Sequence, residues 1–251
     1  MAVIALFIIY LSRESSDWTW FTDYQYLTKL FGITLSFIYI GISIEKTSFF
    51  KIIWNFGFSK FIISIAISAI ILFSSGKASE LINLVFNVDA SAFPYTRAYI
   101  VGLLVFQYTS PFLVIIACFY ILHSIDIWYY IKKLINRNSS YYTEVPYLSI
   151  LFLISSITFL LFSYNWVKRD FSEDAYPSKI YRLAHILDFN SKHPCLNINK
   201  NTKVIFLDSA YNKVLVDENN IKTKNIESFI NKDSSKVFIP KKFNIVFCKI
   251  D

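Results

Sequence analysis

The sequence is short of the residues from which many enzyme sites are built. Its 251 residues include only five glycines and three cysteines. No Gly-rich loop that could cradle a phosphate is present, and no nucleophile elbow, HExxH pair or CxxC pair occurs. We therefore expect a protein that is not an enzyme and that holds no cofactor and no metal ion.

Charge is also scarce in the first two thirds of the chain, whereas hydrophobic residues make up 55% of the whole. A helix needs about 20 apolar residues to cross a hydrocarbon core of about 30 Å. Four runs meet that requirement: 25–44, 58–75, 98–122 and 146–164. Their centres lack Asp, Glu, Lys, Arg and His, which argues against a transporter or proton pump.

The distribution of charge predicts a polytopic α-helical membrane protein with a small C-terminal α/β domain. We place the transmembrane helical domain at residues 1–164 and the soluble domain at 165–251. Within the second domain, residues 178–189 have apolar side chains at helical spacing. Short strands are predicted at 203–207, 213–216 and 237–250, the last interrupted by a turn at Pro240, and one or two helical turns at 225–231.

Three shorter segments also favour a membrane. Residues 1–12 span only about 18 Å as a helix, so they fit neither a full span nor a signal peptide, and a fifth spanning helix stays open. Residues 80–86, capped by Ser79, are expected to lie flat on the bilayer surface. Residues 49–58 place Trp54 beside Lys51, which is typical of a membrane boundary.

Two of the three cysteines lie in the C-terminal domain, at the two ends of its predicted strands. A disulfide between Cys195 and Cys248 would contribute about 4 kcal/mol of stability by closing the intervening loop. Disulfides persist in oxidising compartments, which favours the periplasm for this domain. Two free thiols are the alternative, and His193 with Cys195 is a weak metal pair because a second pair is missing.

The positive-inside rule gives the same orientation, though with a small margin. The loops at 45–60 and 123–145 contain six lysines and arginines, against four on the opposite side. We therefore expect a bacterial inner-membrane protein whose C-terminal domain is periplasmic. The loop before the third span then lies on the same side, with candidate partner-facing residues Asp89, Phe93, Tyr95 and Arg97.

Several polar residues in or near the predicted spans have both a structural and a functional interpretation. The cluster Gln107, Tyr108, Thr109 and Ser110 precedes Pro111, so it is either a packed kink or a pore or ligand site. Ser64 and Ser68 form a small-residue face that suits packing within the chain or in a homo-oligomer.

Two further pairs of titratable residues are given structural interpretations. His123 and Asp126 are three residues apart, so they can meet on one helical face, and a hydrogen bond is favoured over a metal site. Asp208 and Asp217 end predicted strands and are interpreted as turn formers rather than as paired catalytic carboxylates.

The resulting hypothesis is a non-enzymatic inner-membrane protein that presents its periplasmic domain to a protein partner. The C-terminal domain carries 15 Lys or Arg against 10 Asp or Glu, which suits solvent, anionic lipid or an acidic protein, and no nucleic-acid motif accompanies it. Within this class we favour an immunity-type protein that protects against a membrane-active or periplasmic toxin. The alternatives are an oligomeric sensor or channel-like component of a stress or phage-defence system, and an accessory subunit of an envelope complex.

Overall fold

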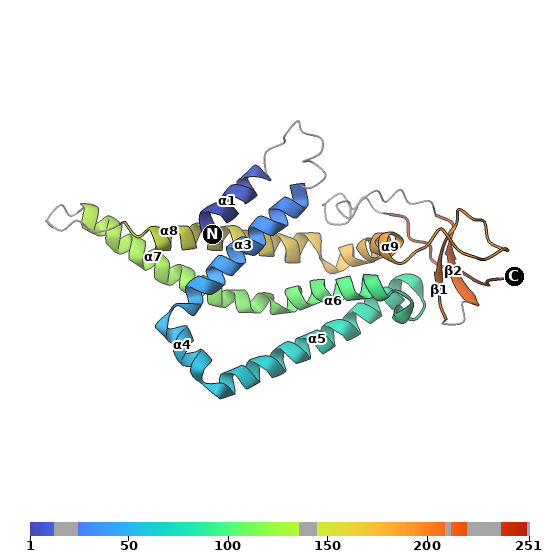
Figure 1. The fold of residues 1–251 in the computed structure, drawn as a ribbon, viewed down its shortest axis with the longest axis horizontal. Helices are drawn as coiled ribbons and strands as arrows, with labels where there is room; N and C mark the ends of the chain where they lie inside the picture. Colours follow the sequence, from blue (N-terminus) through green and yellow to red (C-terminus); the bar gives the residue numbers. More distant parts are fainter. Residues whose placement is uncertain (13–24, 136–144, 209–211, 220–236, 250–251) are drawn as a thin grey trace. The chain divides into compact units, whose positions relative to one another are not determined.

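The computed structural model describes residues 1–12, 25–135, 145–208, 212–219 and 237–249, which are mostly helical (Figure 1). The helices are α1 (Ala2–Leu11), α3 (Gln25–Glu45), α4 (Ser48–Asn55), α5 (Gly57–Phe86), α6 (Pro94–Thr109), α7 (Leu113–Ile135), α8 (Tyr147–Asn165) and α9 (Tyr176–Leu187). The strands are β1 (Lys203–Phe206), β2 (Lys213–Asp217) and β3 (Asn244–Phe247). Short 3-10 turns cover Ala90–Ala92, Ser110–Phe112 and Glu173–Ala175, and Trp166–Asp170 form a π-helical turn.

Within the described residues, four segments are long and apolar enough to cross a membrane: Leu27–Glu45, Gly57–Phe86, Leu113–Ile135 and Tyr147–Lys168. All four overlap the predicted runs, although the third candidate covers 113–135 where the predicted run covers 98–122. Within the predicted run, a 3-10 turn at Ser110–Phe112 interrupts the α-helix, because Pro111 has no N–H to donate and its ring disfavours a regular helix through the preceding turn. The third candidate therefore begins at Leu113 and includes His123 and Asp126.

Helix α5 extends well past the predicted span and does not leave a separate helix at 80–86. Ser79 Oγ donates to the Ser75 carbonyl within the helix instead of capping a new one. Ile82 and Phe86 are buried in protein rather than facing a bilayer surface. The helix ends at Asn87, whose φ of 54° is a left-handed conformation that asparagine tolerates at a helix terminus.

The chain forms two compact units, each with its own core. Unit 1 comprises residues 1–64 and 109–166, and unit 2 comprises residues 65–108 and 167–251. Unit 2 therefore combines most of α5 and α6 with the C-terminal segment. The predicted boundary at residues 164 and 165 concerns membrane topology and stays a prediction.

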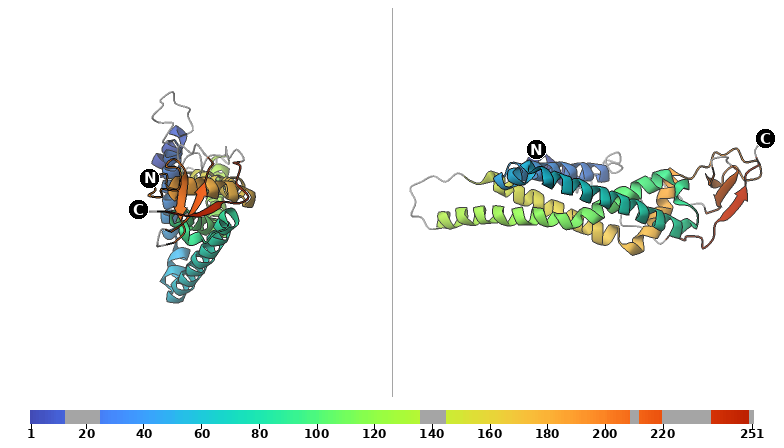
Figure 2. Two further views of the ribbon diagram at one scale, coloured as in Figure 1. Left: turned by 90° about the vertical axis from the view of Figure 1, so that its right-hand side faces the viewer. Right: turned by 90° about the horizontal axis from the view of Figure 1, so that it is seen from below.

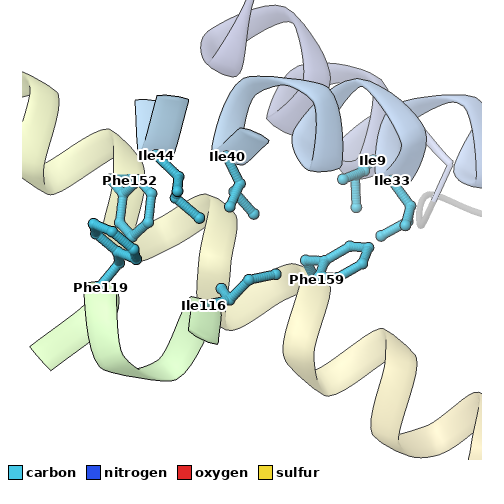
Figure 3. Packing of buried hydrophobic residues seen from close by; sticks show 8 residues of the cluster. All are labelled: Ile9, Ile33, Ile40, Ile44, Ile116, Phe119, Phe152 and Phe159. Carbon is cyan, nitrogen blue, oxygen red and sulfur yellow. The ribbon is translucent and has the colours of Figure 1, made fainter. Parts of the chain in front are cut away.

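The core of unit 1 is an apolar cluster from four helices, α1, α3, α7 and α8 (Figure 3). Its eight buried members are Ile9, Ile33, Ile40, Ile44, Ile116, Phe119, Phe152 and Phe159. On α8 the buried side chains are all serine or phenylalanine and lie on one helical face, namely Ser149, Phe152, Ser155, Ser156, Phe159 and Ser163. Small serines between large rings allow close helix packing, and α7 lies alongside α8 (Figure 2).

Helix α1 packs closely along α3 at a glycine. A Cβ atom on Gly32 would lie 2.6 Å from Ile9 Cγ1 and 3.1 Å from the Ala5 carbonyl oxygen. Only glycine therefore allows the two backbones to approach this closely. Gln25 Nε2 also donates to the Ser12 carbonyl at 2.8 Å, which joins the end of α1 to the start of α3.

Unit 2 contains an antiparallel sheet in the order β1-β2-β3, with Val204 opposite Val216 and Leu215 opposite Ile245. These strands confirm the predictions at 203–207, at 213–216 and in the second part of 237–250. Residues 237–240 do not form a strand, so that part of the prediction is wrong. The helical turns predicted at 225–231 lie outside the described residues. Helix α9 confirms the helix predicted at 178–189, and its Ile180, Leu183 and Ala184 are fully buried.

We predict that Gly32→Ala weakens the packing of α1 on α3. The added methyl group must displace Ile9 or the Ala5 backbone, and overpacking of this kind typically costs about 1–3 kcal/mol. Thermal unfolding of the purified full-length protein would measure the loss. Gly41→Ala, on the same helix with open space around it, is the matched control and should not lower the midpoint. Equal midpoints for both variants would contradict the close contact.

Candidate functional site

The loop predicted to face a partner lies in unit 2, and its four residues have different roles. Asp89 Oδ1 accepts the Ser91 N–H at 2.7 Å. Hydrogen bonds from the side chain and the backbone of Ser91 lower the pKa of the Asp89 carboxyl. Arg97 Nη2 donates to Ser75 Oγ at 3.0 Å, which holds the start of α6 against α5. Tyr95 is 67% exposed, so it is the largest side chain of the four that is available to a partner.

The prediction that Phe93 faces a partner is wrong, because its side chain is fully buried. Its ring stacks on Phe86 with a centroid separation of 4.3 Å and meets the edge of Phe189 at 6.3 Å. Tyr181 and Phe243 also contact Phe86 in this aromatic core. Phe93 therefore supports the loop from inside and does not face a partner.

Helix α6 is joined to α9 near both of its ends. The Asp188 carboxylate accepts the backbone N–H groups of Tyr95 at 3.2 Å and Thr96 at 2.9 Å, where the α6 dipole favours a negative charge. At the other end, Tyr176 donates its hydroxyl to Gln107 Oε1 at 2.8 Å. The loop and α9 thus form one structure within unit 2.

The polar cluster Gln107, Tyr108, Thr109 and Ser110 lies where α6 ends, before the third candidate span begins at Leu113. The Gln107 side chain accepts the hydrogen bond from Tyr176, and the Tyr108 ring packs edge-on against the Phe73 ring, with centroids 5.2 Å apart. These contacts favour the packed kink over a pore or ligand site.

The predicted disulfide between Cys195 and Cys248 is confirmed, with Cα atoms 5.0 Å apart. Both cysteines are buried on one face of the sheet, in a cluster with Val204, Val214 and Val216. His193, the other half of the weak metal pair, lies within 3.3 Å of the Asn199 carbonyl oxygen. In the described part of the chain, no three His, Cys, Asp or Glu side chains gather as metal ligands.

The best-defined polar cluster surrounds Asp217, at the end of β2. Its Oδ2 accepts the Tyr181 hydroxyl at 2.5 Å and lies 2.8 Å from His185 Nε2, while its Oδ1 accepts the Asn219 N–H at 2.9 Å. Lys203 Nζ donates to the His185 carbonyl at 2.9 Å. Asp217 is therefore a buried attachment point for α9 as well as a turn former, whereas Asp208 accepts two loop N–H groups as the sequence predicts.

The charge states within this cluster follow from burial and hydrogen bonding. Burial lowers the pKa of His185, and the hydrogen bond to Asp217 opposes this without reversing it. Burial alone would raise the pKa of Asp217, but the hydrogen bonds from His185, Tyr181 and the Asn219 N–H together lower it. Burial and the bond to Asp217 raise the pKa of Tyr181. At neutral pH a neutral His185 therefore donates Nε2–H to an ionised Asp217.

A Tyr, His and Asp in contact suggest acid-base chemistry, but this cluster is closed to substrates. The His185 and Asp217 side chains are almost completely buried, between α9 and the sheet. The arrangement fixes α9 on β2, which is a structural role. Its sequence signal was the presence of two polar residues four apart, Tyr181 and His185, among the apolar residues of α9.

An exposed apolar surface lies on β3, which the sequence did not single out. Leu215 and its partner Ile245 share one face of the sheet, and Leu215 is buried whereas Ile245 is 52% exposed. Phe247 is on the same face and is 67% exposed, with Lys213 Nζ 5.7 Å from its ring centroid. We call Ile245, Phe247 and Lys213 the β3 surface.

In unit 1, His123 Nδ1 lies 3.7 Å from Asp126 Oδ2, which is beyond hydrogen-bond distance, so the predicted direct hydrogen bond between the two side chains is not formed. Both reach Ser149, whose Oγ lies 2.9 Å from His123 Nδ1 and donates to Asp126 Oδ2 at 3.3 Å. Ser149 is only the third residue of α8, so the group lies level with one end of that helix. The group joins α7 to α8 through Ser149.

Comparisons of the chain with protein-family models, with curated proteins and with solved structures found no match.

We predict that unit 2 loses stability as the pH falls from 7 to 5. The pKa of His185 is lower in the folded chain than the unfolded value of about 6.5, so the unfolded chain binds the extra proton first. Stability then falls by up to about 1.4 kcal/mol per pH unit below 6.5, until the pH reaches the folded pKa. Asp217 adds a further loss only below its ordinary pKa of 3.8, because its folded pKa is lowered.

The measurement is thermal unfolding of the full-length protein at pH 7, 6 and 5. His185→Gln keeps an N–H donor for Asp217 but does not titrate, so its midpoint should fall less between pH 7 and 5 than the wild-type midpoint. His193→Gln removes a histidine outside the cluster and should retain the wild-type pH dependence. The prediction fails if His185→Gln and wild type lose stability equally over this range.

Proposed function

We propose that this chain is a multi-pass protein of the bacterial inner membrane that presents a periplasmic domain to a protein partner, without catalysing a reaction. Helices α3, α5, α7 and α8 are the proposed spans. In α5, only 6% of its most apolar 18-residue window is buried by the rest of the chain, which suits a helix surrounded by lipid. The C-terminal segment after α8 is the proposed periplasmic part.

The observation that carries the binding role is the β3 surface. Exposed large apolar side chains, aromatic ones above all, are typical of the centre of a protein interface, and charged residues such as Lys213 belong to its polar rim. The free edge of β3 is not an open pairing site, because Asn197 donates to the Phe247 carbonyl and accepts the Lys249 N–H. A partner would therefore contact side chains on the sheet face, and the lysine favours an acidic one.

Within this class we favour an immunity-type protein that binds a membrane-active or periplasmic toxin. The Cys195–Cys248 disulfide and the closed Asp217 cluster make the C-terminal domain a rigid binding module, and a rigid surface loses little entropy on binding. Neither the neutralisation of a toxin by binding nor its exclusion from the membrane requires a catalytic group.

One observation favours the second candidate, an oligomeric sensor or channel-like component of a stress or phage-defence system. Ser64 and Ser68 are both exposed on α5, where small residues would allow a second copy to pack closely. An accessory subunit of an envelope complex would use the same exposed surfaces. The mass of the detergent-solubilised protein separates these candidates, since a monomer counts against the oligomeric channel.

The orientation has a direct test in intact cells. In a Cys118→Ser background, a membrane-impermeant maleimide should label Cys195 and Cys248 only after an impermeant reductant has opened the disulfide. Cells permeabilised before labelling provide the control for total reactive thiol. Labelling that requires permeabilisation would place the domain in the cytoplasm and overturn the proposed side.

The binding role predicts that Phe247→Ser abolishes protection by this protein. Truncation of a central interface aromatic costs roughly 2 kcal/mol or more of binding energy. Cells lacking the gene would be complemented with wild type, Phe247→Ser or Phe238→Ser and challenged with cognate or neighbouring toxins. Phe238 is equally apolar and exposed but lies outside the strands, so its variant should protect as well as wild type.

Membrane levels of all three proteins would be compared by immunoblot, so that loss of protein is not mistaken for loss of binding. Survival that is the same with and without wild type, for every toxin tried, would overturn the immunity role. Equal protection by Phe247→Ser and wild type would instead show that the partner does not bind the β3 surface.

A further inference from the structure

The short helix α4 is held at the boundary between two candidate spans. Helix α3 ends at Glu45 and α5 begins at Gly57, so only two residues precede α4 and only Phe56 follows it (Figure 1). If α3 and α5 cross the bilayer, these joints are too short for α4 to move away from its surface. In the proposed membrane topology, these short connections alone therefore keep α4 at the membrane surface.

The side chains of α4 divide into faces that suit this position. Phe49, Ile52, Ile53 and Phe56 recur at helical spacing, and all four are exposed. Ser48, Lys51 and Asn55 form a polar stripe, and Thr47 caps the helix by accepting the Phe50 N–H. An eight-residue helix with its apolar side uncovered is not stable in water, whereas an interfacial environment covers that side.

Three lysines accompany this apolar stripe. Lys46 precedes α4, Lys51 lies on its polar stripe, and Lys60 in the first turn of α5 places Nζ 5.5 Å from the Trp54 ring centroid. In the described part of the chain, none of the three ammonium groups pairs with a carboxylate within 4.0 Å. Glu45 is the single acidic residue between positions 45 and 60.

We propose that α4 with Lys46, Lys51 and Lys60 is a binding surface for the headgroup phosphates of anionic phospholipids. The apolar stripe enters the acyl boundary, Trp54 lies at the headgroup level, and the ammonium groups meet the lipid phosphates. A lysine near an anionic membrane surface contributes about fivefold in affinity. In the proposed topology this surface lies on the side opposite the C-terminal domain, in the cytoplasmic leaflet.

The test compares lipid retention by the full-length protein in nanodiscs of mixed phosphatidylglycerol and phosphatidylcholine. Native mass spectrometry after release from the disc would count the two lipids that stay bound. We expect wild type to retain phosphatidylglycerol preferentially and Lys51→Gln/Lys60→Gln to lose about 25-fold of that preference. Lys241→Gln/Lys242→Gln removes two exposed lysines of the C-terminal domain and should behave as wild type.

Two further measurements keep the outcome unambiguous. Lys51→Arg/Lys60→Arg retains both charges and should restore the preference, while inorganic phosphate should not displace the lipid. The proposal is overturned if the glutamine variant keeps the wild-type preference, if the arginine variant loses it as well, or if phosphate alone competes. These results are independent of the maleimide and survival experiments, so the lipid surface and the binding role can fail separately.

Discussion

The buried carboxylate of Asp217 organises unit 2. An ionised group inside a protein must be compensated by donors, and here the donors are Tyr181 and His185, one turn apart on α9. Their spacing of four residues lets both reach the same carboxylate oxygen. The sheet can therefore hold α9 in only one register, and α9 in turn holds the start of α6 through Asp188. Helix α9 thus links the start of α6 to the sheet within unit 2.

The two faces of the sheet are closed by different means, which explains why β3 is exposed. One face is covered by the disulfide between Cys195 and Cys248 together with apolar residues that include Val214. On the other face, Leu215 is buried, but that cover ends before its neighbour Ile245 on β3. The exposed residues of β3 thus continue a face whose central residue Leu215 is buried, and the Asn197 hydrogen bonds hold the β3 backbone.

Sequence reasoning succeeded where a single local property decides the structure. Apolar runs located α3 and α8, and cysteine positions at the two ends of a domain gave the disulfide. It failed where distant contacts decide. A hydropathy run cannot show on which side of Pro111 a span continues. Phe93 in a polar loop and Asp217 at a strand end resemble surface residues until their partners Phe86 and His185 are known.

The chain also has a chemical asymmetry along the proposed membrane normal. In the topology that we propose, α5, α7 and α8 are three crossings that follow α4, which would place the C-terminal segment on the opposite side from α4. In that topology the α4 side carries lysines that form no ion pair within the described residues, beside exposed aromatic rings, and the other side carries a disulfide and a neutral buried histidine. Lysines suit the leaflet that is rich in anionic lipid, whereas a disulfide persists only where the compartment is oxidising. Because these two constraints are independent, an inverted orientation would violate both at once.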